Sequence, residues 1–162
     1  MKKKINLTFG ITLINKKFGK NQFYHYLEVP NNSIIIPKYK NKFVIVSQRR
    51  IPINKVTYEF PSGWVDKGES PLNSAKRELL EETGYKCLNK PTKLLTICPE
   101  AGRLKNKNYC FFCEKTSKTS KPEKGVKVHL VSKNQIIKLI KSEKFNNASH
   151  IAAFYTYLYR RN

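Results

Sequence analysis

The residues best suited to do chemistry are acidic side chains that recur within about one turn of a predicted helix. Glu78 and Glu82 are four positions apart, so they lie on one helix face, with Glu81 beside them. Carboxylates this close repel one another unless a cation joins them, and clustered oxygen ligands suit Mg²⁺ or Mn²⁺. Only 11 of the 162 residues are Asp or Glu, so an ordinary solvated helix is a poor explanation for this cluster. We therefore predict a divalent metal site here.

The helix that must position these acids is predicted for residues 71–83. Ser70 suits the N-cap, Pro71 suits the first helical position, and Gly84 suits the residue that ends a helix. The side away from the acids is apolar and is expected to pack on the core through Leu72, Ala75 and Leu79.

The loop before the helix is rich in turn residues, in the segments 61–63 and 67–69. A loop that folds back over the helix can offer a backbone carbonyl as a metal ligand and can place Glu69 near Arg77. Arg77 and Glu81 are also four apart and can pair across one turn.

The segment from residue 63 to residue 85 resembles the Nudix box. It matches the polar and glycine positions that define the box, namely Gly63, Glu69, Arg77, Glu78, Glu81, Glu82 and Gly84, and Tyr85 replaces the usual aliphatic residue. The resemblance implies an α/β (α+β) fold, the Nudix-type α/β/α sandwich, with a mixed sheet and a loop-helix-loop catalytic motif. It also implies a metal-binding set of Glu78, Glu82, Glu81 and the carbonyl of Ser62, and a catalytic set that includes Arg77, Glu81 and Glu82. The cofactor would be Mg²⁺ or Mn²⁺.

The flanks of the box resemble the ADP-ribose and ADP-sugar pyrophosphatase branch of the family. The resemblance is carried by the strand end at 47–50, the Glu-x-Pro-x-Gly lead-in at 59–63, and the proline at 99. It implies substrate contacts from Arg50 or Arg49, Glu59 and Arg103. The implied reaction is hydrolysis of ADP-ribose, or of a related nucleoside diphosphate sugar, to AMP and ribose 5-phosphate.

The identity of the general base is open at this point. The branch often uses a glutamate from a mobile loop late in the chain, and Glu123 is the only acid in the predicted loop at 115–124. Glu81 is the alternative. Aromatic side chains at 23, 24 and 26 can stack an adenine, although aromatics at strand spacing more often belong to a core. Members of the branch are commonly homodimers whose N-terminal strands help to form the partner's site, so a homodimer is expected.

Two other functions compete with this interpretation. The net charge of +21 favours RNA contact, and hence an RNA 5′-pyrophosphohydrolase or a dinucleoside polyphosphate hydrolase. The lead-in around Glu59 and the proline at 99 argue against that, and lysine spread along the whole chain also fits biased composition. A Nudix-like protein that senses a nucleotide without hydrolysing it would not need the complete set of carboxylates.

The remaining pattern predicts a single domain over residues 1–162, in which N-terminal strands at about 1–30 contribute to a dimer. Strands are expected at 23–29, 33–37, 43–46 and 126–131, and further helices after Ser132 and over 148–159, the last with Ala152, Tyr155 and Tyr159 on one face. Cys110 and Cys113 are interpreted as buried residues on opposite sides of a strand. The absence of a long apolar run or a cleavable leader favours a cytoplasmic protein without membrane contact.

Overall fold

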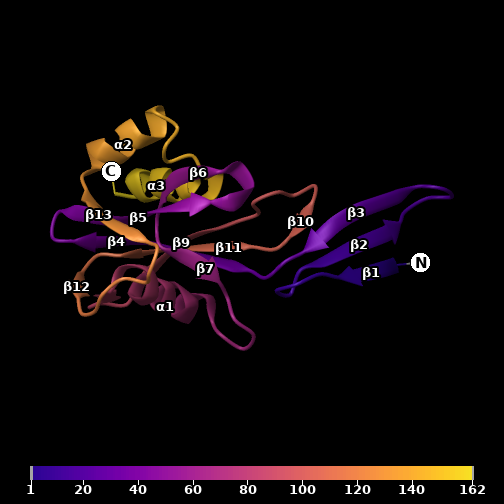
Figure 1. Ribbon diagram of the computed structural model, residues 1–162, viewed down its shortest axis with the longest axis horizontal. Coiled ribbons are helices and arrows are strands. Elements are labelled where there is room, and N and C mark those ends of the chain that lie inside the picture. Colours follow the sequence, from indigo (N-terminus) through magenta and orange to yellow (C-terminus); the bar gives the residue numbers. More distant parts are fainter. Residues whose placement is uncertain (1, 162) are drawn as a thin grey trace.

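The computed structural model describes residues 2–161, which form helices on both sides of a central sheet and a smaller sheet that projects from one end (Figure 1). The helices are α1 (Pro71–Thr83), α2 (Lys133–Lys141) and α3 (Ala148–Tyr159). The strands are β1 (Lys2–Asn6), β2 (Thr12–Lys17), β3 (Phe23–Glu28), β4 (Asn32–Tyr39), β5 (Lys42–Arg50), β6 (Lys55–Glu59), β7 (Ser62–Trp64), β8 (Tyr85–Cys87), β9 (Thr92–Ile97), β10 (Leu104–Lys105), β11 (Asn108–Cys113), β12 (Thr116–Lys118) and β13 (Lys127–Val131).

The central sheet is mixed and has the order β13-β5-β4-β11-β9, with β6 beside β5 and β7 beside β4. Strand β11 runs parallel to β4, whereas β5, β7 and β9 pair antiparallel with their neighbours. Neighbouring side chains of a strand point to opposite faces. The run Ile34, Ile35, Ile36 of β4, which is fully buried, therefore demands apolar cover on both sides.

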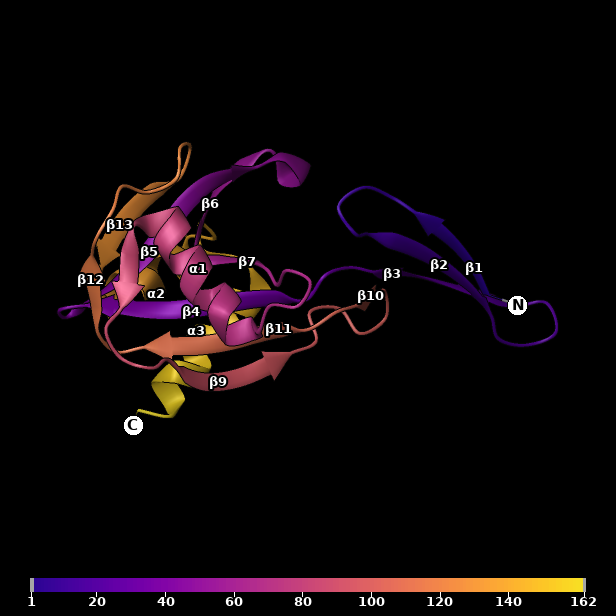
Figure 2. The ribbon, with the colours of Figure 1, turned by 90° about the horizontal axis from the view of Figure 1, so that it is seen from below.

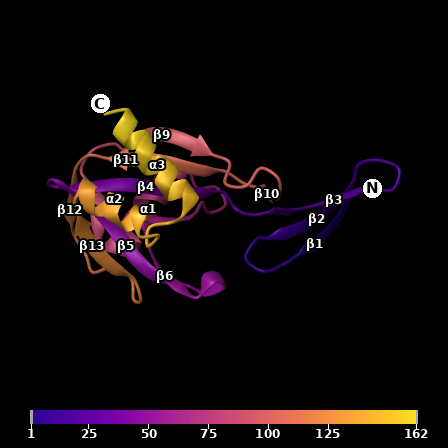
Figure 3. The same ribbon diagram turned by 90° about the horizontal axis from the view of Figure 1, so that it is seen from above.

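The helices supply that cover in two layers. Ala75 and Leu79 of α1 pack with Ile35 on one face, and Ile136 of α2 and Phe154 of α3 pack with the cluster that includes the flanking isoleucines on the other. Figures 2 and 3 show α1 against one side of the sheet and α2 and α3 against the opposite side. The predicted α/β/α sandwich is thus confirmed.

The projecting sheet has the order β1-β2-β3-β10. Strand β10 lies parallel to β3, and the backbone N–H of Leu27 donates to the carbonyl of Arg103 at 2.8 Å. Since β10 belongs to the segment between β9 and β11, this pairing attaches the N-terminal strands to the main body (Figure 1).

The predicted helices and strands are present, but β6, β7, β8, β9 and β10 were not predicted. The expected loop at 115–124 contains a strand, β12, which pairs with β8, because β8, directly after α1, offers it a free edge. On α3, Tyr155 and Tyr159 of the predicted shared face are exposed, and the buried positions include Ala153, Phe154 and Tyr157.

Cys110 and Cys113 are buried in the clusters on opposite faces of β11, as predicted. The thiol of Cys113 donates to the carbonyl of Lys115 at 3.3 Å, and Cys87 of β8 packs against the same cluster as Cys113. Within residues 2–161, no helix combines the length and apolar character needed to cross a membrane.

Candidate active site

Helix α1 is delimited by local signals and held in place by a distant loop. The Ser70 hydroxyl accepts a hydrogen bond from the Asn73 backbone N–H at 3.2 Å, which caps the first turn. Gly84 ends the helix with φ 71°, a left-handed conformation that favours glycine. A Cβ at Gly84 would lie 2.1 Å from the carbonyl oxygen of Ser120, so the loop after β12 closes on the helix end only because a glycine stands there.

Arg77 ties the loop before the helix to the acids on the helix. Its guanidinium donates to both carboxylate oxygens of Glu69, at 3.2 and 3.0 Å, and to the carbonyl of Trp64 at 2.9 Å. It also donates to Glu78 at 2.7 Å and to Glu81 at 3.0 Å. The hydrogen bonds from Arg77 lower the pKa of Glu69. The predicted contacts of Arg77 with Glu69 and Glu81 are therefore present in the structure.

Glu78 and Glu82 lie against strand β7, and both are shielded from solvent. The backbone N–H of Ser62 donates to the Glu82 carboxylate at 3.0 Å, and Glu82 is 7% exposed. A Cβ at Gly63 would lie only 2.0 Å from Oε1 of Glu78, so the missing side chain of Gly63 makes room for this carboxylate. Burial raises the pKa of Glu82 to about 8 against the opposing effect of the Ser62 hydrogen bond, and the charge of Glu78 adds to the rise.

The donor set suits a hard divalent cation. Burial also raises the pKa of Glu78, so these neighbouring carboxylates lack enough compensating charge, and a bound cation would supply it. Among residues 2–161, no three His, Cys, Asp or Glu side chains are already gathered as a complete metal site. Glu78 and Glu82, with the carbonyl of Ser62, are the residues that would hold the ion, and Glu81 is close to them on the same helix.

A pocket of about 400 Å³ opens beside these carboxylates. Its walls include Arg50, Glu59, Gly63, Trp64, Pro99 and Asn108. Arg50 donates to both oxygens of Glu59, at 2.8 and 2.5 Å, and Thr57 donates to the same carboxylate at 2.5 Å. Burial alone would raise the pKa of Glu59, but the hydrogen bonds from Arg50 and Thr57 and the nearby His150 lower it overall.

His150 of α3 also lines this pocket. It is 2% exposed; its Nδ1 accepts from the Phe60 backbone N–H at 3.0 Å, and its Nε2 lies 3.9 Å from Glu59. Sequence analysis missed His150, because a single histidine in an apolar helix carries no signal of its own. The structure shows that it satisfies a buried N–H directly before the turn into β7.

The titration of His150 should make folding depend on pH. Burial lowers the pKa of His150 to about 4 from 6.5; Glu59 opposes this shift and Arg50 adds to it. Below pH 6.5 the unfolded chain takes up a proton that the folded chain excludes, so stability falls as the pH falls toward 4. Relative to His150→Asn, which keeps an acceptor for Phe60, the wild type should lose about 2 kcal/mol more between pH 7 and pH 4.5.

Urea unfolding of both proteins at the two pH values measures this difference. The comparison cancels the contributions of the other carboxylates, because they are present in both chains. Equal losses in the two proteins would show that His150 is not buried as a neutral side chain.

Comparison with known proteins places this geometry in a family. The model of the NUDIX domain matches residues 29–154. This range includes the central sheet, α1, α2, the first part of α3 and the whole acidic motif. The chain belongs to the Nudix family. The resemblance of residues 63–85 to the Nudix box is thereby confirmed.

Several relatives share parts of this Nudix chain. The ADP-ribose pyrophosphatase of Bacillus subtilis (strain 168) is 31% identical over 114 residues, 67% of this chain and 61% of that protein. The methanol dehydrogenase activator of Bacillus methanolicus is 47% identical over 55 residues, 34% of this chain and 30% of that protein. An RNA pyrophosphohydrolase of Bartonella bacilliformis is 53% identical over 32 residues, 20% of this chain and 19% of that protein. The matches therefore span less than two thirds of these relatives.

A solved structure shows the same fold. The crystal structure of an ADP compounds hydrolase superposes with a TM-score of 0.79 at 17% identity, covering 96% of this chain and 89% of that one. At this identity the similarity supports the Nudix fold alone, and it includes most of the N-terminal sheet because the coverage is nearly complete.

The structure gathers some of the predicted substrate residues beside the Nudix box and separates others. Arg50 and Glu59 both line the pocket, and the carboxylate of Glu59, which is 2% exposed, accepts hydrogen bonds from Arg50. Arg49 points to the other side of β5, where it donates to Asn54 at 3.1 Å. Arg103 lies over the Tyr24 ring at 4.9 Å, outside the lining of this pocket.

Glu123 lies near the C-terminal end of the Nudix helix. Its backbone N–H donates to the carbonyl of Glu81 at 2.8 Å, and both residues line a cleft with Leu80 and Lys121. The side chain of Glu123 is exposed. The two alternative bases, Glu123 and Glu81, are therefore neighbours, joined through the main chain.

Proposed function

We propose that this chain is a divalent-metal-dependent pyrophosphohydrolase that cleaves a nucleoside diphosphate sugar. The favoured substrate is ADP-ribose, which would give AMP and ribose 5-phosphate. The observation that supports this most directly is the pair of shielded carboxylates, Glu78 and Glu82, packed against β7 beside a pocket that contains Arg50. The named activity of the Bacillus subtilis relative supports the choice of substrate.

In this proposal each residue has a defined task. A bound Mg²⁺ or Mn²⁺ would neutralise the diphosphate and lower the pKa of a water molecule. Arg50, held bidentately by Glu59, would present its remaining N–H groups to a phosphate. Arg77 would hold the loop before α1 against the helix through its hydrogen bond to Glu69. Water attacks phosphorus, the bridging P–O bond breaks, and the water proton passes to Glu123 or, alternatively, to Glu81.

We also propose that residues 2–161 act as one unit in a cytoplasmic homodimer. The register of the projecting sheet places Ile5, Leu13 and Leu27 in one row across β1, β2 and β3. Ile5 is 48% exposed and Phe9, in the turn after β1, is 79% exposed. An exposed apolar row on a projecting sheet favours contact with a second copy. Light scattering of the purified protein measures its mass directly.

An RNA 5′-pyrophosphohydrolase is the second candidate function. The net charge of +21 and the similarity to RNA pyrophosphohydrolases over the box favour it. A turnover screen with Mg²⁺ and then Mn²⁺ separates the candidates, with ADP-ribose, ADP-glucose, GDP-mannose, NADH, diadenosine polyphosphates and 5′-triphosphate RNA as substrates. Cleavage of ADP-ribose or an ADP-sugar supports the proposal. Cleavage of RNA or polyphosphates alone supports the second candidate, and no cleavage at all supports a nucleotide-sensing protein.

Replacement of Arg50 should weaken substrate binding selectively. In Arg50→Lys the positive charge opposite Glu59 remains, but the planar fork that joins Glu59 to a phosphate is lost. We expect the KM for ADP-ribose to rise about tenfold, with a smaller change in kcat. Steady-state kinetics measure both constants.

Arg49→Lys is the matched control. Arg49 precedes Arg50 on β5 but is exposed on the other side of the strand, where it contacts Asn54. Its KM should stay within about twofold of the wild type. An equal rise in KM for the two variants would show that overall charge, and not the Arg50–Glu59 pair, governs binding.

A further inference from the structure

One face of the projecting sheet combines cations with aromatic rings. Lys4 lies opposite Ile14, which lies opposite Tyr26, and Lys16 lies opposite Tyr24. Directly opposed residues of adjacent strands share a face. Lys4, Lys16, Tyr24 and Tyr26 therefore occupy the same side of the sheet, which we call the tyrosine face.

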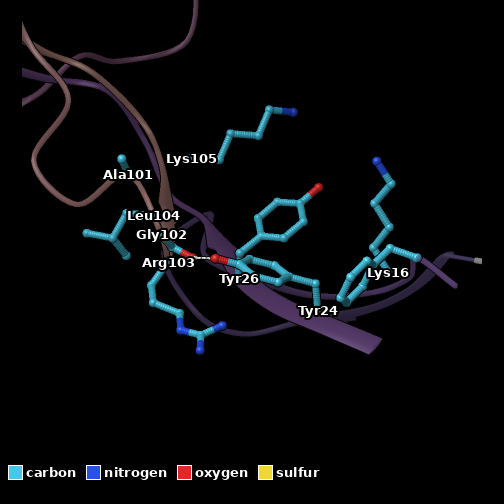
Figure 4. A pocket seen from close by; sticks show the side chains of 9 residues that line it. Lys16, Tyr24, Tyr26, Ala101, Gly102, Arg103, Leu104 and Lys105 are labelled. Atoms are coloured by element: carbon cyan, nitrogen blue, oxygen red, sulfur yellow. Dashed lines mark hydrogen bonds between the residues drawn. The ribbon is translucent and has the colours of Figure 1, made fainter. Parts of the chain in front are cut away.

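The segment around β10 extends the tyrosine face and hollows it. The Arg103 guanidinium lies over the Tyr24 ring at 4.9 Å, and Lys105, next along β10, pairs with Glu28 at 3.0 Å. These residues enclose a pocket of about 420 Å³ with Lys16 and Tyr26. In Figure 4 the amino groups of Lys16 and Lys105 extend on the side to which the Tyr26 ring points. The described lining of this pocket contains no carboxylate.

The rings on this face are held in place and remain accessible. Tyr24 is 38% exposed, its hydroxyl donates to the carbonyl of Gly102, and Phe18 meets its ring edge-on at 6.2 Å between centroids. Tyr26 is partly buried above Ile14. Rings fixed beside cations, on a surface open to solvent, are suited to flat ligands that also carry negative charge.

The opposite face of the same sheet has different chemistry. The residues that alternate with the tyrosine face are Lys3 and Lys17 together with the apolar row of Ile5, Leu13 and Leu27. This face also carries Phe23, which lies opposite Lys17 and is 53% exposed, but it carries no tyrosine. The tyrosine face is distinguished by its pocket, in which two tyrosine rings lie beside Arg103, Lys16 and Lys105.

We propose that the tyrosine face binds single-stranded nucleic acid. Bases would stack on Tyr26 and on Tyr24 beside Arg103, while Lys4, Lys16 and Lys105 would contact phosphates, which is how sequence-tolerant single-strand sites combine stacking with charge. An acidic peptide would satisfy the cations but would have no flat groups for the rings. This binding is separate from the Nudix box and requires neither the metal nor hydrolysis.

Fluorescence anisotropy tests the proposal with short oligouridine and oligothymidine strands. Both strands have 5′-hydroxyl ends, and a chelator is present during the measurement. The double variant Lys4→Gln/Lys16→Gln should weaken binding about tenfold at low salt. The plot of log K against log salt concentration should also become less steep by about 1.4, because each of the two lost phosphate contacts contributes about 0.7 to the slope. Tyr26→Leu, which keeps an apolar side chain over Ile14, should weaken binding about tenfold through lost stacking.

The double variant Lys3→Gln/Lys17→Gln is the matched control, because it removes the same charge from the other face of the same strands. Its affinity should stay within about twofold of the wild type. Tighter binding of oligouridine than of oligothymidine identifies RNA as the ligand, and the reverse identifies DNA. The proposal would be overturned if both lysine double variants weakened binding equally, or if Tyr26→Leu bound with the wild-type affinity. It would also be overturned if a short polyglutamate peptide bound as tightly as the oligonucleotides.

Discussion

Glu82→Gln is expected to lower kcat for pyrophosphate hydrolysis by about 1,000-fold, while the protein stays folded. Glutamine retains an oxygen to accept the hydrogen bond from the Ser62 N–H at 3.0 Å, so the local structure is kept. It removes the negative charge that a cation at this position requires. Because burial raises the pKa of Glu82 to about 8, loss of the charge should not reduce the free energy of unfolding measured without metal, and it can increase it.

The control for Glu82→Gln is Glu143→Gln, which makes the same change at an exposed position after α2. Its kcat should match the wild type. Single-turnover kinetics and urea unfolding, measured on both variants, separate lost chemistry from lost folding. If Glu82→Gln retains more than about a tenth of the wild-type kcat, Glu82 is not a metal ligand.

Gly63→Ala is expected to lower kcat by about 100-fold with little change in stability. The added Cβ would lie 2.0 Å from Oε1 and 2.1 Å from Cδ of Glu78. The far end of that side chain can rotate away, so the fold should tolerate the methyl group. A shift of about 1 Å in a group that positions the reaction can nevertheless cost about 100-fold in rate.

Gly125→Ala gives the opposite pattern and serves as the control. Gly125 has φ 94° and open space around its Cα. An alanine there is strained by backbone conformation alone, so it should cost about 1 kcal/mol of stability and leave kcat unchanged. The assignment of Glu78 to the metal site would be wrong if Gly63→Ala kept wild-type kcat, or lost activity only in proportion to lost folding.

Local signals explain why the helix of the Nudix box was predictable to the residue. The Ser70 cap, the proline at 71 and the glycine at 84 act through hydrogen bonds and backbone preferences within a few positions. The pairing of Arg77 with Glu81 has the same local origin, since both stand four apart on one helix. Such contacts need no knowledge of the rest of the fold.

The substrate pocket was predictable only in part. Arg50 and Glu59, which the family resemblance suggested, both line the pocket, but the resemblance did not indicate that Arg50, Thr57 and His150 surround the Glu59 carboxylate. Residue 59 stands nine positions from Arg50 and 91 from His150 in the sequence. The register of β5 against β6 and the docking of α3 decide these contacts, and neither leaves a pattern in one sequence.

The sequence by itself determined the helix of the Nudix box, the alternation of strands and helices, and the family, because each depends on short spacings that the chain carries locally. Only the tertiary structure decided which face of α3 is buried, that β12 forms within the expected loop, and that Arg50 rather than Arg49 faces the pocket. It also decided that Tyr24 and Tyr26 enclose a pocket with Lys16, Arg103 and Lys105. These outcomes depend on strand register and on the packing of distant segments, where a shift of one residue exchanges the two faces.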